Sequence, residues 1–455
     1  MTQIEKIDET IVSIIDAGTY SYDDIDKIRD SVFEALNRIR ANMLINTGDT
    51  VLIKPNLVMD TNHIRSNGTD CLFTQPCVIE AVVEYVVNQL EGVGRIIIGD
   101  APMQECVFEN IRGLQDIVSK YKSRELKIEL VDFREIKSHV DSGVHKSEFN
   151  PNAHGKIINL GRDSLFYNEE EKCLSNLRIT NYDPRILPKH HFGEIHEYYI
   201  SEYVLDADVI INMPKPKSHR KAGATIALKN FVGANTRKEF LPHHTIGSIK
   251  DGGDEYEKKS LVHSLRTKLF DVKNILEADN KYSRARAIGV IILFLTAILK
   301  FSNNPYSEGS WYGNDTISKT ISDLNRIVTY ADKNGKLCIS KQRNIINVAD
   351  MIISGEKEGP VAPSPKNVGF IAAGLNQVCF DEVISTMMGF DYHKIPAIVR
   401  ARNNEHRLPL VNKNAVPVIS SNIIEYDGKV INELDKNTLL RFIPTEGWKG
   451  HIELE

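Results

Sequence analysis

The chain has 455 residues, of which 42% are hydrophobic and 26% are charged, a composition typical of globular proteins. Its 56 Lys and Arg nearly balance 61 Asp and Glu, and the net charge of −5 argues against a nucleic-acid-binding protein, which needs a basic face. The six cysteines form no Cys-x-x-Cys pair, which excludes a ferredoxin-type cluster and a compact zinc ribbon. The N-terminus has no secretory pattern, so we expect a cytoplasmic protein.

The first predicted elements are typical of an α/β protein. Residues 1–45 have helical spacing of apolar side chains, and we expect an N-terminal helical segment there. Three short apolar runs with helices between them predict buried strands at 50–53, 95–98 and 127–133. Pro76 is placed to open the helix between the first two strands. Strand–helix–strand units of this kind build parallel sheets.

The middle of the chain interrupts this alternation twice. The polar, irregular stretch at about 135–200 predicts a β-rich insertion, after which a strand is expected at 207–212. A long helical excursion is expected at 235–315, and alternation resumes over 316–455. The predicted fold is α/β, with an open, mostly parallel or mixed sheet and helices on both faces. Its first half is expected at 46–234 and its second half at 316–455.

One apolar segment, 287–299, departs from the pattern of a soluble chain, since it holds thirteen residues without a charge. A helix of this length is about 20 Å long, well short of the ~30 Å hydrocarbon core of a bilayer. One interpretation is a buried core helix. The other is a peripheral membrane contact anchored by Arg284, Arg286 and Lys300, which would place the protein at the inner face of the membrane.

Ionisable residues follow three of the predicted strands, those at 50–53, 95–98 and 207–212, at the edge where ligands bind in open α/β sheets. Lys54 and Asn56 follow the first strand, and Asp100 follows the second. A lysine at this edge is able to hold a phosphate or a carboxylate. Asp100 is a metal ligand, a general base or simply the salt-bridge partner of a lysine. The phosphate-loop motif and the GxGxxG motif are both absent from the sequence, which argues against a nucleotide-binding fold of those types.

Residues 212–233 are the richest stretch, with a cluster of basic residues before a turn and a predicted short helix. The side chains in it that we expect to bind an anion or act on it are Lys215, Lys217, His219, Thr225, Lys229 and Asn230. Free N–H groups at the start of the helix would favour an anion such as phosphate. The alternative is a solvated basic turn, which charge runs usually form.

A second group of residues has the chemistry of a metal site. His243 and His244 precede an acidic stretch that contains Asp254, and Asp350 lies in a later predicted strand. Imidazole and carboxylate groups suit a divalent metal ion, whose identity the pattern leaves open. A flexible polar loop is the alternative, because neither histidine has a histidine four residues away. Asp381 begins a predicted helix, where an acid is either a cap or a catalytic carboxylate.

The order of these motifs over about 50–390 resembles the domain of unknown function 362 family. The motifs are Lys54-Pro55-Asn56, Gly99-Asp100, the stretch 212–233, Asp350 with Gly359-Pro360, and Gly374 with Asp381 and Gly389. The resemblance implies an α/β domain whose motif residues line one pocket, but no settled reaction. Many members carry an iron–sulfur module. The C-terminal part of this chain lacks the cysteines for one, so no iron–sulfur cluster is expected. The stretches 243–257 and 311–315 resemble a subgroup found near surface-polysaccharide genes.

These features predict a metal-assisted enzyme that acts on a small anionic substrate bearing a phosphate or a carboxylate. If the enzyme works in surface-polysaccharide biosynthesis, that group would be linked to a sugar. Lys54, Lys215, Lys217 and Lys229 would bind the negative charge, and Asp100, His219 and Asp381 would be catalytic. Transfer and hydrolysis both remain open. The alternative is a non-catalytic, membrane-associated binding or scaffold protein for a lipid-linked glycan intermediate. The sequence carries no signal for an oligomeric state.

Overall fold

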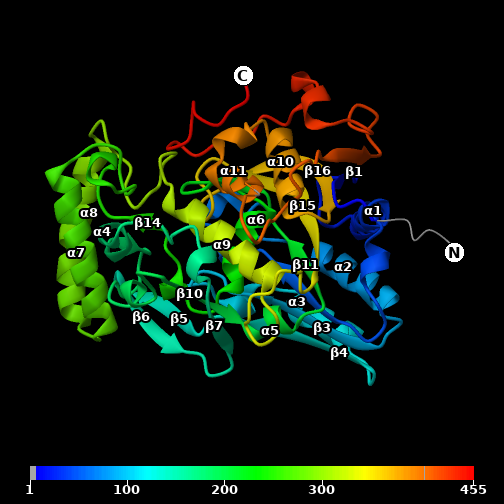
Figure 1. The fold of residues 1–455 in the computed structure, drawn as a ribbon, viewed down its shortest axis with the longest axis horizontal. Helices are drawn as coiled ribbons and strands as arrows, with labels where there is room; N and C mark the ends of the chain where they lie inside the picture. The colour runs from blue at the N-terminus through cyan, green and yellow to red at the C-terminus, as the bar shows by residue number, and fades with distance from the viewer. Residues whose placement is uncertain (1–6, 404) are drawn as a thin grey trace.

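A computed structural model describes residues 7–403 and 405–455, and a large mixed sheet forms its centre (Figure 1). Five neighbouring strands run parallel, in the order β15-β11-β2-β3-β4. Their bounds are Asn344–Glu356, Val209–Met213, Thr50–Pro55, Gly94–Asp100 and Leu126–Asp132. The sheet continues beyond β15 through β16 (Ser364–Gly374), β1 (Ile11–Asp16) and β17 (Val418–Ser421). The first pairing beyond β15, with β16, is antiparallel, which makes the sheet mixed.

Helices cover both faces of this sheet, which confirms the predicted α/β fold. Alternate residues of a strand point to opposite faces, so Val51 and Ile53 belong to one apolar core and Leu52 to the other. The first core is completed by α1 (Ile25–Arg38), α2 (Pro76–Gln89) and α3 (Leu114–Tyr121). The second is completed by α9 (Thr316–Tyr330), α10 (Gln377–Met387) and α11 (Pro396–Arg402).

The N-terminal segment differs from the helical segment expected at 1–45, of which residues 1–6 lie outside the described residues. Strand β1 comes first and helix α1 begins only at Ile25. Val12 and Ile14 pack in one core while Ile15 packs in the other, so the strand is covered on both faces. A strand buried on both sides has no alternation of apolar and polar residues, and its sequence is easily taken for part of a helix.

The β-rich insertion expected at about 135–200 is present. It contains the hairpin β5 (Ile136–Asp141) and β6 (Val144–Phe149). A separate three-stranded sheet has the order β7-β10-β9, with bounds Gly155–Asn159, Ile195–Ser201 and His191–Phe192. These strands lie beside the main sheet (Figure 1).

The helical excursion forms an antiparallel pair of helices at one end of the molecule, on the left of Figure 1. Helix α7 spans Leu261–Ala278 and α8 spans Tyr282–Lys300, which includes the apolar segment 287–299. Among the described residues α8 is the one helix long and apolar enough to cross a membrane, and 22% of its most apolar window is buried. The core-helix interpretation of 287–299 is therefore wrong, because Leu293 and Phe294 are 71% and 67% exposed.

Candidate functional site

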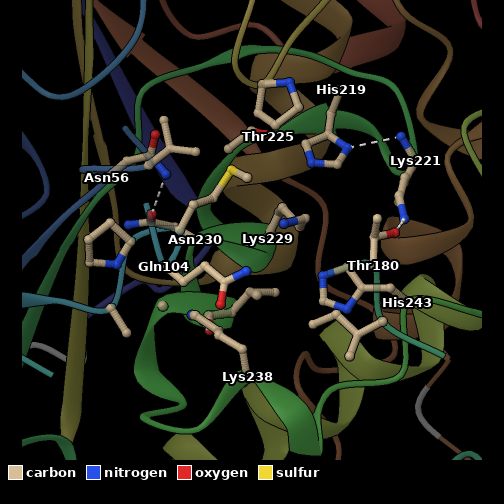
Figure 2. Close-up of a pocket in the computed structure, with 18 of the residues that line it drawn as sticks. Asn56, Gln104, Thr180, His219, Lys221, Thr225, Lys229, Asn230, Lys238 and His243 are labelled. Carbon is tan, nitrogen blue, oxygen red and sulfur yellow. Dashed lines mark hydrogen bonds between the residues drawn. The ribbon is translucent and has the colours of Figure 1, made fainter. Parts of the chain in front are cut away.

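A cavity of about 170 Å³ opens where β2 and β3 end, at the edge of the sheet predicted to bind ligands (Figure 2). Opposite these strand ends lie the short hairpin β12 (Lys217–His219) and β13 (Gly223–Thr225), and then α6 (Ala227–Asn230). The predicted site residues that line the cavity are Asn56, Asp100, Lys217, His219, Thr225, Lys229, Asn230 and His243. Those that do not line it are Lys54, Lys215, His244, Asp254, Asp350 and Asp381.

Positive charge dominates the wall of the cavity. The cationic side chains are Lys217, Arg220, Lys221, Lys229 and Lys238, against the carboxylates of Asp100 and Glu105. Three of the lysines donate to neutral groups: Lys217 Nζ to Asn56 Oδ1 at 2.6 Å, Lys221 Nζ to Thr180 Oγ1 at 3.1 Å, and Lys238 Nζ to the carbonyl of Val232 at 3.0 Å. Within the described residues none of the five forms an ion pair with a carboxylate.

Burial changes the protonation of all four of these lysines, and it lowers the pKa of Lys217 well below its normal value. It lowers the pKa of Lys221 and of Lys238 to about 7, and that of Lys229 to about 8. The charge on Lys54 lowers the pKa of Lys229 further, because like charges disfavour one another. A bound anion would raise these pKa values again, since it would supply the negative charge that the lysines lack as a partner.

The two histidines of the cavity have opposite tautomers. His219 Nδ1 accepts hydrogen bonds from the backbone N–H groups of Lys221 and Ala222, both at 3.1 Å, so the ring proton is on Nε2. His243 Nδ1 lies 2.9 Å from the carbonyl of Leu241 and donates to it, so Nε2 carries a lone pair. Burial and the neighbouring cations hold both pKa values well below normal, and both rings are neutral at pH 7. The cavity thus has one imidazole donor and one imidazole acceptor.

The Thr225 side chain adds a hydroxyl without a partner. Thr225 is buried, and its Oγ1 has no hydrogen-bond partner among the described residues. Its side chain lies on the wall of the cavity, on the same side as His219 (Figure 2). Buried hydroxyls are normally satisfied, so this atom is placed to bond a ligand.

The start of α6 does not bind an anion in the way the sequence suggests. The N–H groups of Ala227 and Leu228 already donate to the two carboxylate oxygens of Asp381, at 2.8 and 3.1 Å. Asp381 is buried outside the cavity, and burial raises its pKa well above the normal range. The carboxyl group predicted to be catalytic therefore holds the backbone beneath the cavity.

Replacing Asp381 by alanine is expected to lower the free energy of unfolding by about 2–4 kcal/mol, because two buried N–H groups lose their acceptor. Urea denaturation followed by circular dichroism measures this change. Glu425→Ala, at an exposed acid, is the control and is expected to stay within about 0.5 kcal/mol of the parent. An Asp381→Ala protein as stable as the parent would show that the carboxyl group is not structural.

Asp100 also has structural contacts that the sequence does not reveal. Its Oδ1 lies 2.7 Å from Lys54 Nζ, and both side chains are almost fully buried. The same carboxylate accepts the backbone N–H groups of Leu57 and Ala101, each at 2.9 Å. A Cβ on Gly233 would lie 1.9 Å from Asp100 Oδ1, so only glycine fits against this pair. Of the alternatives considered for Asp100, the salt-bridge partner is the one with direct contacts in the structure.

Lys215 and Asp350 form a second buried ion pair, 2.9 Å long, away from the cavity. Asp350 also accepts the hydroxyl of Tyr22 at 2.8 Å and the N–H of Gln75 at 3.0 Å. Lys215 was expected to bind substrate and Asp350 to bind metal. They neutralise each other instead, because the parallel pairing of β11 with β15 brings the two segments together.

The four predicted metal ligands do not come together. Asp254 accepts the N–H groups of Thr245, Asp315 and Thr316 and so fixes the start of α9. His243 lines the main cavity, whereas His244 lines a smaller one. In the part of the chain that the structure describes, no group of three or more His, Cys, Asp or Glu side chains is arranged to hold a metal ion.

Two of the lysines in the cavity are not among the site residues predicted from the sequence. Lys221 ends the basic run that begins at Lys215, and that run was the available signal. Lys238 has no comparable signal, since it begins a short 3-10 helix after α6 and reaches the cavity only because the chain turns back there. Figure 2 shows it across the cavity from His219 and Thr225.

Comparison with known proteins gives a family but no activity. Residues 168–386 match the family model described as "Domain of unknown function (DUF362)". No curated protein matches the chain. Among solved structures, the chain is similar to the crystal structure of a protein from Thermotoga maritima, at 9% identity and a TM-score of 0.34. That match covers 80% of this chain and 58% of the other.

Proposed function

Since this chain belongs to the domain of unknown function 362 family through residues 168–386, whose description names no reaction, we propose its function from the cavity. We propose that it is an enzyme that binds and acts on a small anionic substrate, with a phosphate group, or a carboxylate in its place, held by the lysines of the cavity. A divalent cation would enter as the counter-ion of that phosphate. A role in surface-polysaccharide biosynthesis would make the substrate a sugar phosphate.

The observation that carries the proposal is a contrast between two kinds of buried lysine. Lys54 and Lys215 are both fully buried, and each has a carboxylate within 3 Å. Lys221, Lys229 and Lys238 surround the cavity without a carboxylate partner in the described chain. Buried charges are normally paired, and a bound anion would complete the pairing at the cavity.

The histidines give this cavity the means for proton transfer. His219 Nε2–H would donate to a phosphate oxygen, as would the hydroxyl of Thr225. His243 Nε2 would accept the proton of a water or of a substrate hydroxyl as that oxygen attacks. His243 would serve in this way in hydrolysis and in group transfer. The reaction is hydrolysis if the attacking oxygen belongs to water, and group transfer if it belongs to a hydroxyl of a substrate.

Calorimetric titration with inorganic phosphate tests the proposal, because it measures the protons that the protein takes up on binding. At pH 8 Lys221 and Lys238 are mostly neutral, because their pKa values are about 7. Bound phosphate raises these pKa values, so binding takes up protons and the affinity falls as the pH rises from 7 to 9. The uptake is read from the difference in binding heat between two buffers of unlike ionisation enthalpy. Absence of binding heat, or equal heats in both buffers, would contradict the proposal.

The alternative, a non-catalytic binding protein for a lipid-linked glycan intermediate at the inner face of the membrane, is favoured by the exposed apolar face of α8. Incubation with a panel of sugar phosphates separates the two functions. An enzyme converts at least one of them, and His243→Ala abolishes that conversion while phosphate still binds. A binding protein takes up phosphate with the same affinity and releases no product.

A further inference from the structure

The α7–α8 pair has its polarity reversed relative to a normal surface hairpin. The side of α7 turned to the protein buries Arg266, Lys273 and Glu277, whereas the outer side of α8 exposes large apolar side chains. Phe301, directly after α8, is 93% exposed. Surface helices usually place charged residues outward and apolar residues inward. The reversal indicates that the outer face meets something other than water.

The exposed apolar residues form a stripe on each of the two helices. On α8 they follow helical spacing, and Phe301 directly after the helix continues it: Val290, Leu293, Phe294, Ala297, Ile298 and Phe301. On α7, Leu261, Leu265 and Val272 form a second exposed stripe. Positions separated by three, four, seven and eleven residues share one side of an α-helix, so these are aligned surfaces and not scattered exposures.

Ion pairs fix the helices in this orientation. Glu277, which pairs with Lys273 within α7, accepts the backbone N–H of His145 through its Oε1 at 2.9 Å, and Arg266 lies 2.7 Å from Glu308. Arg266 also donates to Thr296 Oγ1 of α8 at 2.9 Å, and so joins the two helices. Rotating the hairpin to bury its apolar face would break the contacts with His145 and Glu308 and would leave Arg266 without its carboxylate partner.

The charges around the exposed apolar face of α8 indicate which kind of partner it fits. Tyr282–Lys300 contains no Asp or Glu, and it carries Arg284, Arg286 and Lys300. In an antiparallel pairing of two copies, the arginines of one α8 would oppose the lysine of the other, and like charges would repel. Basic residues beside an apolar helical face suit an anionic lipid surface.

We propose that the α7–α8 hairpin docks on an anionic membrane surface, with α8 lying in the plane of the interface. Spanning is disfavoured because α7 would have to carry Arg266, Lys273 and Glu277 into hydrocarbon. The docking stands independently of the proposed function. It places the phosphate cavity near the headgroups, because Ile179 and Thr180 line that cavity and also the smaller one bordered by α7.

Vesicle flotation of the full chain tests the docking. The vesicles contain phosphatidylcholine with phosphatidylglycerol, or phosphatidylcholine alone. We expect the double variant Leu293→Gln/Phe294→Gln to bind anionic vesicles at least about tenfold more weakly, since both side chains leave the interface. Arg284→Ser and Arg286→Ser are each expected to weaken binding about fivefold at low salt. Ile424→Gln, at a residue 85% exposed and far from the hairpin in sequence, is the matched control and should change nothing.

Sedimentation of the parent protein without lipid distinguishes a second copy from a membrane. A dimer that the Leu293→Gln/Phe294→Gln variant converts to a monomer would overturn the proposal in favour of self-association. Equal binding of both vesicle types, or no flotation with either, would overturn it as well. Circular dichroism of the variants should match the parent, because both replaced side chains are exposed.

Discussion

Replacing Lys229 by methionine is expected to weaken the binding of inorganic phosphate about ten- to a hundredfold at pH 7. A hydrogen bond from a charged group contributes about 1.5–3 kcal/mol, and each 1.4 kcal/mol is about tenfold in affinity. Lys229 is mostly charged at this pH because its pKa is about 8. Its ammonium group forms no hydrogen bond with the residues that the structure describes, so the parent protein does not depend on it for structure. Methionine keeps the length of the apolar stem.

The measurement is titration calorimetry of folded protein at constant ionic strength. Lys122→Met, at an exposed lysine after α3, controls for the loss of one positive charge and should leave the affinity within about twofold. Thr225→Val provides a second variant inside the cavity, because it removes the unpartnered hydroxyl and keeps the shape. If Lys229→Met and Thr225→Val both bind phosphate as tightly as the parent, the cavity is not the anion site.

The sheet and the edge at which the cavity opens were predictable because they depend on local patterns. Buried parallel strands appear as short apolar runs, and ligand sites follow their carboxyl ends. That rule alone places Asn56, Asp100 and the stretch 217–230 at the edge where the cavity lies. The short elements β12, β13 and α6 keep this stretch there, since β12 pairs with both β13 and β15.

The pairing of the charges was not predictable, because it depends on strand order. Lys54 meets Asp100 since β2 lies beside β3, and Lys215 meets Asp350 since β11 lies beside β15. Sequence alone does not show which of several lysines finds a carboxylate. In the described part of the chain, buried lysines without a carboxylate partner characterise the cavity, and Lys238 joins them from a segment after α6 whose path no local pattern indicates.

The orientation of the α7–α8 hairpin was hidden for a related reason. Leu261, Leu265 and Val272 have the helical spacing normally taken as an inward face, yet all are exposed. The inward face is polar because Arg266 has Glu308 as a partner, some forty residues further along the chain. The sequence does not reveal this long-range pair, and the length of the apolar segment 287–299 by itself favours a core helix.

Breaking the Lys54–Asp100 pair is expected to have the largest effect on stability. Lys54→Met leaves a buried carboxylate without its cation, which should lower the free energy of unfolding by about 3–5 kcal/mol. Asp100→Asn should lower it by a similar amount, because the lysine is then stranded at a site where burial already lowers its pKa. The double variant should be destabilised by less than the sum of the two, since neither charge remains. Urea denaturation of all four proteins measures the coupling.

Two further variants show whether the contact itself is responsible. Gly233→Ala places a methyl group 1.9 Å from Asp100 Oδ1 and 2.7 Å from Lys54 Nζ, and should be destabilising although both charges are present. Lys341→Met breaks the exposed pair with Glu9 and should cost about 1 kcal/mol or less. Additive single effects at Lys54 and Asp100 would mean that the pair is not coupled. Asp100→Asn could instead keep the stability of the parent and lose phosphate binding. In that case the carboxylate of Asp100 would be dispensable for folding, and Asp100 would be a residue that acts on the ligand.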